Sequence, residues 1–245
     1  MKALILNSGL GSRMGATTQH KPKCMLEIGE GYTLLSRQLT QLSRAGVPEA
    51  VVTTGPFASM LEAYARSLNI QNMRLTFIHN ADYAVSNYIL SMHLAAPFLQ
   101  DENVLLLHGD LVLEDSVLYD LLHSPTSAVA VDFLLPLPEK DFKAKLNQEK
   151  VIAIGTTLFG EDCVACQPAY CWQAADFSRW MACIHAFVAR QEVNVYAENA
   201  FNDLQGTIPL TPISLAGRLC NEIDNPQDMA AVAPRFLTSI SKPNS

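Results

Sequence analysis

Short apolar runs alternate with amphipathic stretches along the first half of the chain. Each run is rich in Val, Leu, Ile and Ala, which is typical of buried strands. The runs are Ala3–Leu6, Ala50–Thr54, Leu75–His79, Val104–His108 and Ala128–Phe133. Strands that alternate with helices form parallel sheets covered on both faces, so the pattern predicts an α/β fold with a mostly parallel, twisted sheet and helices on both faces.

Apolar stripes at helical spacing predict the helices. The clearest stripe consists of Phe57, Met60, Leu61, Tyr64, Ala65 and Leu68. Its aromatic residues are expected to lie in the core. A second stripe runs from Phe177 to Val188, with Asp176 as the expected N-cap. A last helix is expected to begin near Pro226, and residues 242–245 are expected to form a frayed tail.

The pattern changes after Phe133. Pro136 and Pro138 precede a charged stretch, and a further apolar run follows at Val151–Gly155. We interpret this part as a hairpin-like excursion of β structure. Its loops between Pro136 and Lys150 offer a contact surface for a homo-oligomer.

Composition narrows the classes of protein that this pattern allows. The chain has 245 residues, of which 49% are hydrophobic and 17% charged, so it can bury a large core. Its net charge of −7 and the lack of a basic stripe argue against nucleic-acid binding. No signal-peptide pattern or membrane-spanning run is present, and the six cysteines fit reduced thiols. We therefore expect a cytoplasmic protein that does not bind membranes.

The most informative polar residues follow the first apolar run. There Gly9-Leu10-Gly11-Ser12-Arg13 leads to Lys21-Pro22-Lys23. Glycines let a loop turn tightly and bring backbone N–H groups against an anion, and the cations add positive charge. The loop lacks the spacing of a Walker loop, and Met14 replaces the third glycine of the dinucleotide fingerprint. It therefore predicts a site for a nucleoside triphosphate.

Two carboxylates are candidates for a metal site. Ligands of open α/β sheets bind beyond the carboxyl ends of the strands, where Asp110 follows Val104–His108. Mg²⁺ prefers hard oxygen ligands and commonly takes carboxylates together with substrate phosphates. Asp224, just before Pro226, is the natural second ligand, but its position equally fits a cap of the last helix.

The loop and several later segments resemble the sugar-nucleotidyltransferase-like superfamily. More narrowly, they look like the cytidylyltransferases that activate phosphocholine and related phospho-alcohols or phosphonates. The segments that carry the resemblance are Leu6–Met14 with Lys21–Lys23, Asn80–Ser91, His108–Asp110, Val195–Asn199 and Glu222–Asp224. The resemblance implies a Rossmann-like α/β fold with a smaller β-rich part for the acceptor.

The resemblance also implies roles for individual residues. Arg13 and Lys23 would be the catalytic cations, and Asp110 and Asp224 would hold Mg²⁺. The residues that would bind the nucleotide are Leu6, Ser8, Gly9, Gly11, Ser12, Asn80, Ser86, Asn87 and Gly109. The residues that would face the acceptor are Tyr170, Trp172, Tyr196 and Glu198. His108 is expected to be a packed residue beside the site rather than a ligand.

The implied reaction joins CTP to a phosphorylated small alcohol, such as phosphocholine, or to a related phosphonate. The acceptor is already an anion and needs no general base, which agrees with the lack of a convincing nucleophile triad. Two alternatives remain open: a sugar-1-phosphate nucleotidyltransferase that uses UTP, GTP or dTTP, and a nucleotide-binding regulator without catalysis. We expect one domain over 1–245, with the nucleotide-binding core at 1–133, the acceptor-binding portion at 134–221, and a metal ligand with the last helix at 222–240.

Overall fold

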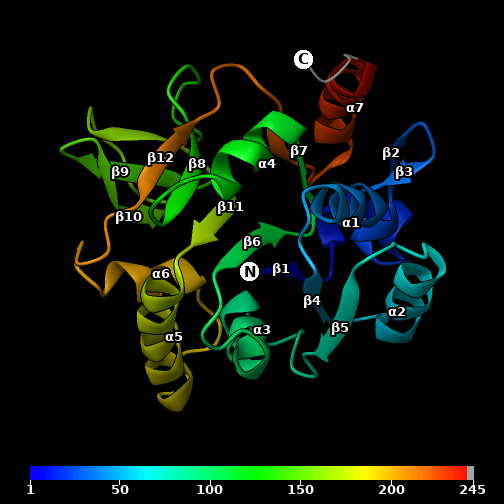
Figure 1. Ribbon diagram of the computed structural model, residues 1–245, viewed down its shortest axis with the longest axis horizontal. Coiled ribbons are helices and arrows are strands. Elements are labelled where there is room, and N and C mark those ends of the chain that lie inside the picture. Colours follow the sequence, from blue (N-terminus) through cyan, green and yellow to red (C-terminus); the bar gives the residue numbers. More distant parts are fainter. Residues whose placement is uncertain (242–245) are drawn as a thin grey trace.

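The computed structural model describes residues 1–241 and contains a central sheet with helices on both sides (Figure 1). The strands follow the order β10-β9-β11-β6-β1-β4-β5, with β8 paired to β11 and β12 paired to β8. The parallel strands of the core are β6 (Val104–His108), β1 (Lys2–Asn7), β4 (Glu49–Thr54) and β5 (Arg74–His79). They coincide with four of the predicted runs, so the α/β prediction is confirmed.

The other part of the sheet comes from the second half of the chain and is largely antiparallel. Its strands are β8 (Ala128–Asp132), β9 (Lys143–Asn147), β10 (Lys150–Gly155), β11 (Cys163–Trp172) and β12 (Thr211–Ser214). β9 and β10 form the predicted hairpin, and β11 is antiparallel to β6, β8 and β9. The smaller β-rich excursion is therefore part of the central sheet.

Helices cover both faces of the sheet, as predicted. One face is covered by α1 (Leu34–Arg44), α2 (Ala58–Ser67), α4 (Asp115–Leu122) and α7 (Pro226–Ser241). The other face is covered by α3 (Tyr88–Ala95), α5 (Ala174–Ala189) and α6 (Ala197–Asn202). Side chains alternate across a strand, so Ala3 and Ile5 of β1 join the first core while Leu4 and Leu6 join the second.

The remaining elements are short, and one pair of them joins distant parts of the chain. They are the 3₁₀ helices η1 (Ser12–Thr18), η2 (Lys23–Met25) and η3 (Ala96–Phe98) and the strands β2 (Glu27–Gly29), β3 (Tyr32–Thr33), β7 (Leu111–Leu113) and β13 (Cys220–Glu222). β13 pairs antiparallel with β7, and the N–H of Ile223 donates to the carbonyl of Asp110 at 3.0 Å. This pairing places Asp110 beside the segment that contains Asp224.

Two details of the helix predictions are wrong. Phe57 and Met60 are 37% and 42% exposed, because Phe57 precedes α2 in a left-handed conformation and only Leu61 and Ala65 of the helix are buried. Helix α5 begins earlier than expected, after Gln173, so Asp176 lies in its first turn and accepts a hydrogen bond from Ser127 Oγ at 2.6 Å. The predicted start of α7 at Pro226 is confirmed, and the tail at 242–245 lies outside the described residues.

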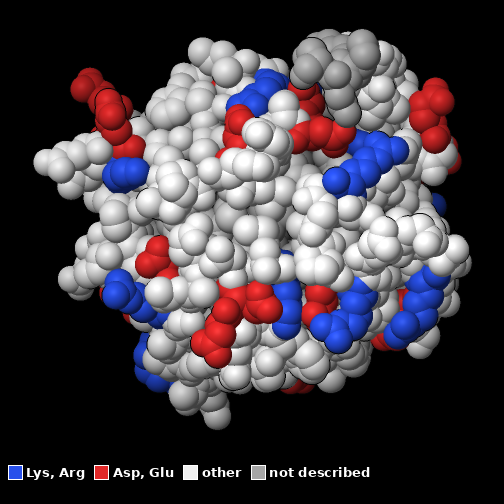
Figure 2. Space-filling view, viewed as in Figure 1, with Lys and Arg blue, Asp and Glu red and all other residues white. Residues whose placement is uncertain are grey.

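Predictions from the sequence also concerned surface charge, the cysteines and membrane-spanning segments. On the face shown in Figure 2, basic side chains lie singly or in small groups, many of them beside acidic ones. All six cysteines are free thiols, and five of them are buried. Within residues 1–241, none of the helices combines the length and the apolar character that a membrane span requires.

Candidate active site

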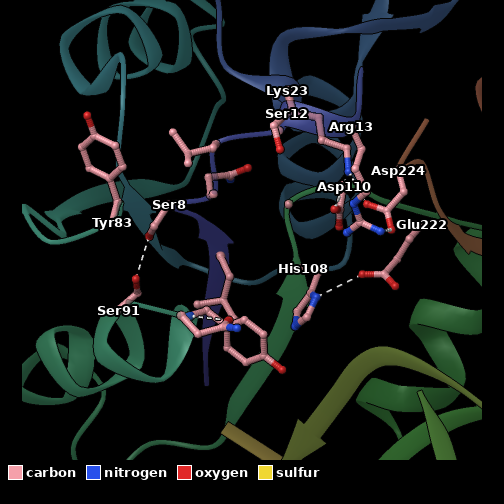
Figure 3. Close-up of a pocket in the computed structure, with 18 of the residues that line it drawn as sticks. Ser8, Ser12, Arg13, Lys23, Tyr83, Ser91, His108, Asp110, Glu222 and Asp224 are labelled. Carbon is pink, nitrogen blue, oxygen red and sulfur yellow. Dashed lines mark hydrogen bonds and ion pairs between the residues drawn. The ribbon is translucent and has the colours of Figure 1, made fainter. Parts of the chain in front are cut away.

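A cavity of about 450 Å³ lies at the carboxyl ends of β1 and β6. Its lining includes most of the predicted site residues: Leu6, Ser8, Gly9, Gly11, Ser12, Arg13, Lys23, Asn80, Ser86, Asn87, Gly109, Asp110, Tyr196 and Asp224. In Figure 3, Arg13, Lys23, Asp110 and Asp224 gather on one side, whereas Ser8, Tyr83 and Ser91 lie on the other. The structure thus brings the predicted nucleotide and metal residues into a single site.

Two glycines of this site are required by their surroundings. Gly11 has φ of 63°, the left-handed region that glycine tolerates best, and it precedes η1. A Cβ on Gly109 would lie 1.8 Å from Asn7 Oδ1 and 2.7 Å from the carbonyl oxygen of Leu6. Only glycine therefore allows the end of β6 to lie this close to the end of β1.

Lys23 links the two predicted metal carboxylates. Its Nζ donates to Asp110 Oδ2 and to Asp224 Oδ1, both at 2.7 Å, and Arg13 forms an ion pair with Asp224 at 2.8 Å. Burial disfavours the ammonium, but the two carboxylates outweigh burial and raise the pKa of Lys23. Burial likewise opposes ionisation of Asp110, but Lys23 outweighs it and lowers the pKa of this carboxyl group. Two cations and two anions therefore balance at this end of the cavity.

Asp224 does not cap the last helix. The side chain of Asn225 accepts hydrogen bonds from the N–H groups of Gln227 and Asp228 at 2.9 and 3.0 Å. The carboxylate of Asp224 faces Arg13 and Lys23 instead (Figure 3). Of the two interpretations that the sequence left open, the cap is therefore excluded.

His108 and Glu222 extend the polar cluster toward the centre of the cavity. His108 Nδ1 lies 3.1 Å from Glu222 Oε1, a contact drawn in Figure 3. Burial, followed by the charge of Asp110, raises the pKa of Glu222 to about 7. Donor atoms of His108, Asp110 and Glu222 all lie within 4.8 Å of one another. His108 is thus a packed residue that contacts the carboxylate cluster, and the expectation that it does not bind the metal stays a prediction.

The carboxylates fit a hard divalent cation. Asp110 Oδ1 is buried and has no hydrogen-bond partner among the described residues, so it is available as a ligand. Asp110, Asp224 and Glu222 supply only carboxylate oxygens, the donor type that Mg²⁺ prefers. Sequence reasoning did not name Glu222 as a site residue, although it stands two positions before Asp224, the spacing that returns to the same side of an extended chain.

The predicted nucleoside side of the cavity is a network of hydroxyl and amide groups. Ser91 Oγ donates to Ser8 Oγ, which donates to Thr53 Oγ1, each at 2.8 Å. Asn80 Nδ2 donates to the hydroxyl groups of Ser86 and Ser91, both at 3.0 Å. Asn80 is buried and its amide hydrogens are used within the protein, so it orients the hydroxyl groups of the wall.

The predicted acceptor residues are only partly brought to the cavity. Tyr196 lines it and is 40% exposed. Tyr170 and Trp172 are 1% exposed and Glu198 is 2% exposed, and none of them lines the cavity. The prediction that these three face the acceptor is wrong, because α5 and α6 cover this part of β11: Trp172 packs against Trp180 of α5, with ring centroids 4.5 Å apart, and against Phe201 of α6.

Residues that the sequence analysis did not name as site residues also line the cavity near Tyr196. Tyr88 and Phe142 line the cavity beside Tyr196, with ring centroids 5.9 Å apart for the two tyrosines and 5.1 Å apart for Phe142 and Tyr196. Lys140, Asp141 and Thr156 also line it. Tyr88 stood within a quoted motif, but only the fold could show which of its residues face the cavity.

The chain belongs to the MobA-like NTP transferase domain family, whose model matches residues 3–193. The predicted membership of a nucleotidyltransferase superfamily is therefore confirmed. The cation and carboxylate cluster described above lies largely within the matched region, with Asp224 and Glu222 following it in the chain.

Two curated relatives are similar in sequence. The chain is 34% identical over 131 residues to CMP-5'-(3-aminopropyl)phosphonate synthase of Streptomyces rubellomurinus, covering 53% of this chain and 20% of that protein. It is 34% identical over 117 residues to choline-phosphate cytidylyltransferase of Haemophilus influenzae, covering 48% of this chain and 47% of that protein. The matched region thus spans about a fifth of one relative and about half of the other.

A solved structure shows the same fold. The inositol-1-phosphate CTP transferase from T. maritima aligns with a TM-score of 0.80 over 100% of this chain and 98% of that chain, at 19% identity. This likeness supports the α/β architecture and the antiparallel excursion.

Proposed function

We propose that this protein is a Mg²⁺-dependent cytidylyltransferase that joins CTP to a phosphorylated small alcohol, such as phosphocholine, or to a related phosphonate. An oxygen of the acceptor attacks the α-phosphorus of CTP and forms a new P–O bond. The bond between the α-phosphorus and the oxygen bridging to the β-phosphorus breaks, and its electron pair leaves with pyrophosphate. The products are a CDP- or CMP-linked compound and pyrophosphate.

The observation that carries the proposal is the bridge of Lys23 between Asp110 and Asp224, with Arg13 beside it. Transfer of this kind depends on positioning and on neutralising the charge that develops on phosphate oxygens. Gly9, Gly11 and Ser12 would contact the triphosphate, and Arg13 and Lys23 would neutralise it. Asp110 and Asp224 would hold Mg²⁺, which would supply further positive charge at the phosphates.

The aromatic wall supports an acceptor with an amine or quaternary ammonium group. Aromatic faces attract cations, and Tyr88, Phe142 and Tyr196 gather in the lining of the cavity, to which Asp141 and Glu222 also belong. The names of two relatives, an aminopropylphosphonate synthase and a choline-phosphate cytidylyltransferase, agree with this acceptor class. The proposed use of CTP and the free thiols support a cytoplasmic location.

The test is pyrophosphate release over a grid of substrates. Each of the four nucleoside triphosphates is combined with phosphocholine, phosphoethanolamine, 2-aminoethylphosphonate and sugar 1-phosphates, with Mg²⁺ present. We expect release with CTP and at least one phospho-alcohol or phosphonate. Turnover of a sugar 1-phosphate with UTP, GTP or dTTP alone would favour the first alternative, and nucleotide binding without any release would favour the regulator.

A further inference from the structure

A buried carboxylate stands directly behind the acceptor wall. Glu198 belongs to α6 and is 2% exposed. One of its oxygens accepts a hydrogen bond from the hydroxyl group of Tyr88, and the other accepts one from the hydroxyl group of Tyr170 at 2.8 Å. Within residues 1–241 it forms no ion pair with a Lys, Arg or His side chain. Since buried carboxylates are costly unless fully hydrogen-bonded, the two phenols are what stabilise it.

Tyr88 connects this carboxylate to the cavity. Its hydroxyl group points back to Glu198, while its ring lines the cavity and packs against His108, with centroids 4.8 Å apart. The ring also contacts that of Tyr196, which itself packs on Phe142. Burial, followed by the charge of Glu198, raises the pKa of Tyr88 and of Tyr170 well above the usual value for tyrosine. Both phenols therefore stay protonated and keep donating.

The three residues come from separate elements that pack against one another. Tyr88 begins α3, where the N–H of Asn87 donates to the carbonyl of Val193 at 2.8 Å. Tyr170 lies within β11, in the middle of the sheet. Glu198 lies on α6. The indole N–H of Trp180 of α5 donates to the carbonyl of Ala197, also on α6, at 3.0 Å. The position of the Tyr88 ring is thus set by the packed core rather than by the cavity surface.

We propose that Glu198 is a positioning residue for the acceptor, which acts through Tyr88 without touching the substrate. Its carboxylate holds the Tyr88 ring against His108 and Tyr196, and so fixes the wall that contacts the remote end of the acceptor. A phenol that donates to a carboxylate has a more electron-rich ring, which strengthens its attraction for a cation. The clamp of Tyr170, Glu198 and Tyr88 therefore favours cationic acceptors over neutral ones. This inference rests on the proposed function.

The test compares E198Q and Y88F with the wild type in pyrophosphate release. An amide cannot accept from both phenols as a carboxylate does, and Y88F removes a single hydroxyl group from the wall. We expect either change to raise the acceptor KM about tenfold, the size of losing a hydrogen bond to a charged group, with the KM for CTP unchanged. E27Q, at an exposed position on β2, is the matched control and should behave as wild type.

The preference for a cationic over a neutral acceptor is a second measurement, and a general loss of stability would leave this preference unchanged. The two isosteric pairs are phosphocholine with 3,3-dimethylbutyl phosphate and 2-aminoethylphosphonate with propylphosphonate. In each pair that the wild type accepts, the preference for the cationic member should fall in E198Q and Y88F. Thermal shift with α,β-methylene-CTP adds a binding measurement: the variants should keep the shift caused by this analogue and lose much of the additional shift caused by the acceptor.

The outcomes separate the two proposals. In one outcome the wild type transfers the cytidylyl group, and folded E198Q and Y88F keep the wild-type acceptor KM and the wild-type preference for the cation. This outcome would overturn the clamp alone. A wild type that neither transfers to nor binds any of these acceptors would overturn the proposed function and the clamp together. If E198Q does not fold, Y88F decides the question, because it leaves the carboxylate with Tyr170.

Discussion

Single residues at this site are constrained by charge and by space. Lys23 stands between Asp110 and Asp224, so each of the three side chains depends on the other two. Gly109 has no room for a side chain, since its neighbour is the Asn7 amide. The sequence identified Lys23, Asp110, Asp224 and Gly109 as site residues, and the structure adds the contacts that constrain them.

Asp110→Asn should reduce turnover about 10²–10³-fold, the range reported for loss of one electrostatic stabiliser, because the amide cannot balance Lys23 or serve as an anionic ligand. The measurement is kcat for pyrophosphate release, with circular dichroism to verify the fold. Asp101→Asn is the matched control: this residue is exposed and has φ of 58°, a conformation that asparagine tolerates. Near-normal turnover of Asp110→Asn would exclude a role in catalysis.

Gly109→Ala should destabilise the protein by about 1–3 kcal/mol, the usual penalty of overpacking, because the new Cβ overlaps the Asn7 side chain. It should also lower activity by displacing the adjacent Asp110. Urea unfolding gives the free energy of unfolding, and Gly155→Ala is the control, since a Cβ there would make only ordinary contacts with Leu158. Equal stability of the two variants would contradict the close approach of β1 and β6.

At the scale of elements, the pairing of β13 with β7 assembles the carboxylate cluster. It joins a segment that follows β6 to one that precedes α7, more than a hundred positions apart in the chain. The start of α7 is capped by Asn225, which frees the neighbouring Asp224 for the cavity. The cap and the proposed metal ligand are therefore adjacent residues with separate tasks.

Those tasks can be separated by mutation. Asn225→Ala should lower the free energy of unfolding by about 1 kcal/mol, as expected for loss of an N-cap, and should speed hydrogen exchange at Gln227 and Asp228. Asp224→Asn should leave exchange in this turn unchanged and should instead reduce turnover. Faster exchange in Asp224→Asn, to the extent seen in Asn225→Ala, would show that Asp224 does contribute to the cap.

At the scale of the whole molecule, the cavity collects groups from both halves of the chain. Arg13 and Lys23 form ion pairs with the carboxylates that would hold Mg²⁺, so a bound metal would compete with these cations for the carboxylates, and a bound nucleotide would compete with the carboxylates for the cations. A triphosphate that draws the two cations toward itself makes the carboxylates available to the metal. Binding of CTP and binding of Mg²⁺ should therefore favour each other.

This coupling predicts that CTP and Mg²⁺ together stabilise the folded protein more than the two ligands do separately. A ligand at 100 times its Kd stabilises the folded state by about 2.7 kcal/mol, so a shift in melting temperature is measurable. Mg²⁺ alone should change the melting temperature little. CTP with Mg²⁺ should raise the melting temperature by more than the sum of the shifts caused by each ligand alone. Addition of EDTA should reverse the excess. A shift with Mg²⁺ alone that equals the shift with both ligands would exclude the coupling.

The parallel core and the glycine-loop side of the cavity could be predicted because their signals are local. Alternation of apolar residues identifies β1, β4, β5 and β6, and the glycine loop with Arg13 and Lys23 lies within one short segment. The acceptor wall could not be predicted, because burial at β11 depends on which helices cover it. Tyr170 and Trp172 are aromatic residues of the kind that line binding sites, but α5 and α6 cover them and they lie in the core.

The sequence by itself determined the class of fold and the glycine loop that lines the cavity, because strand periodicity and glycine geometry act over neighbouring positions. The binding of phosphate by this loop stays a prediction. Only the tertiary structure decided three further features. It assigned the cap of α7 to Asn225, brought Glu222 to His108, and placed Glu198 behind Tyr88 instead of in the cavity. Each of these depends on contacts between residues far apart in the chain, which follow from packing of the whole molecule rather than from any local pattern.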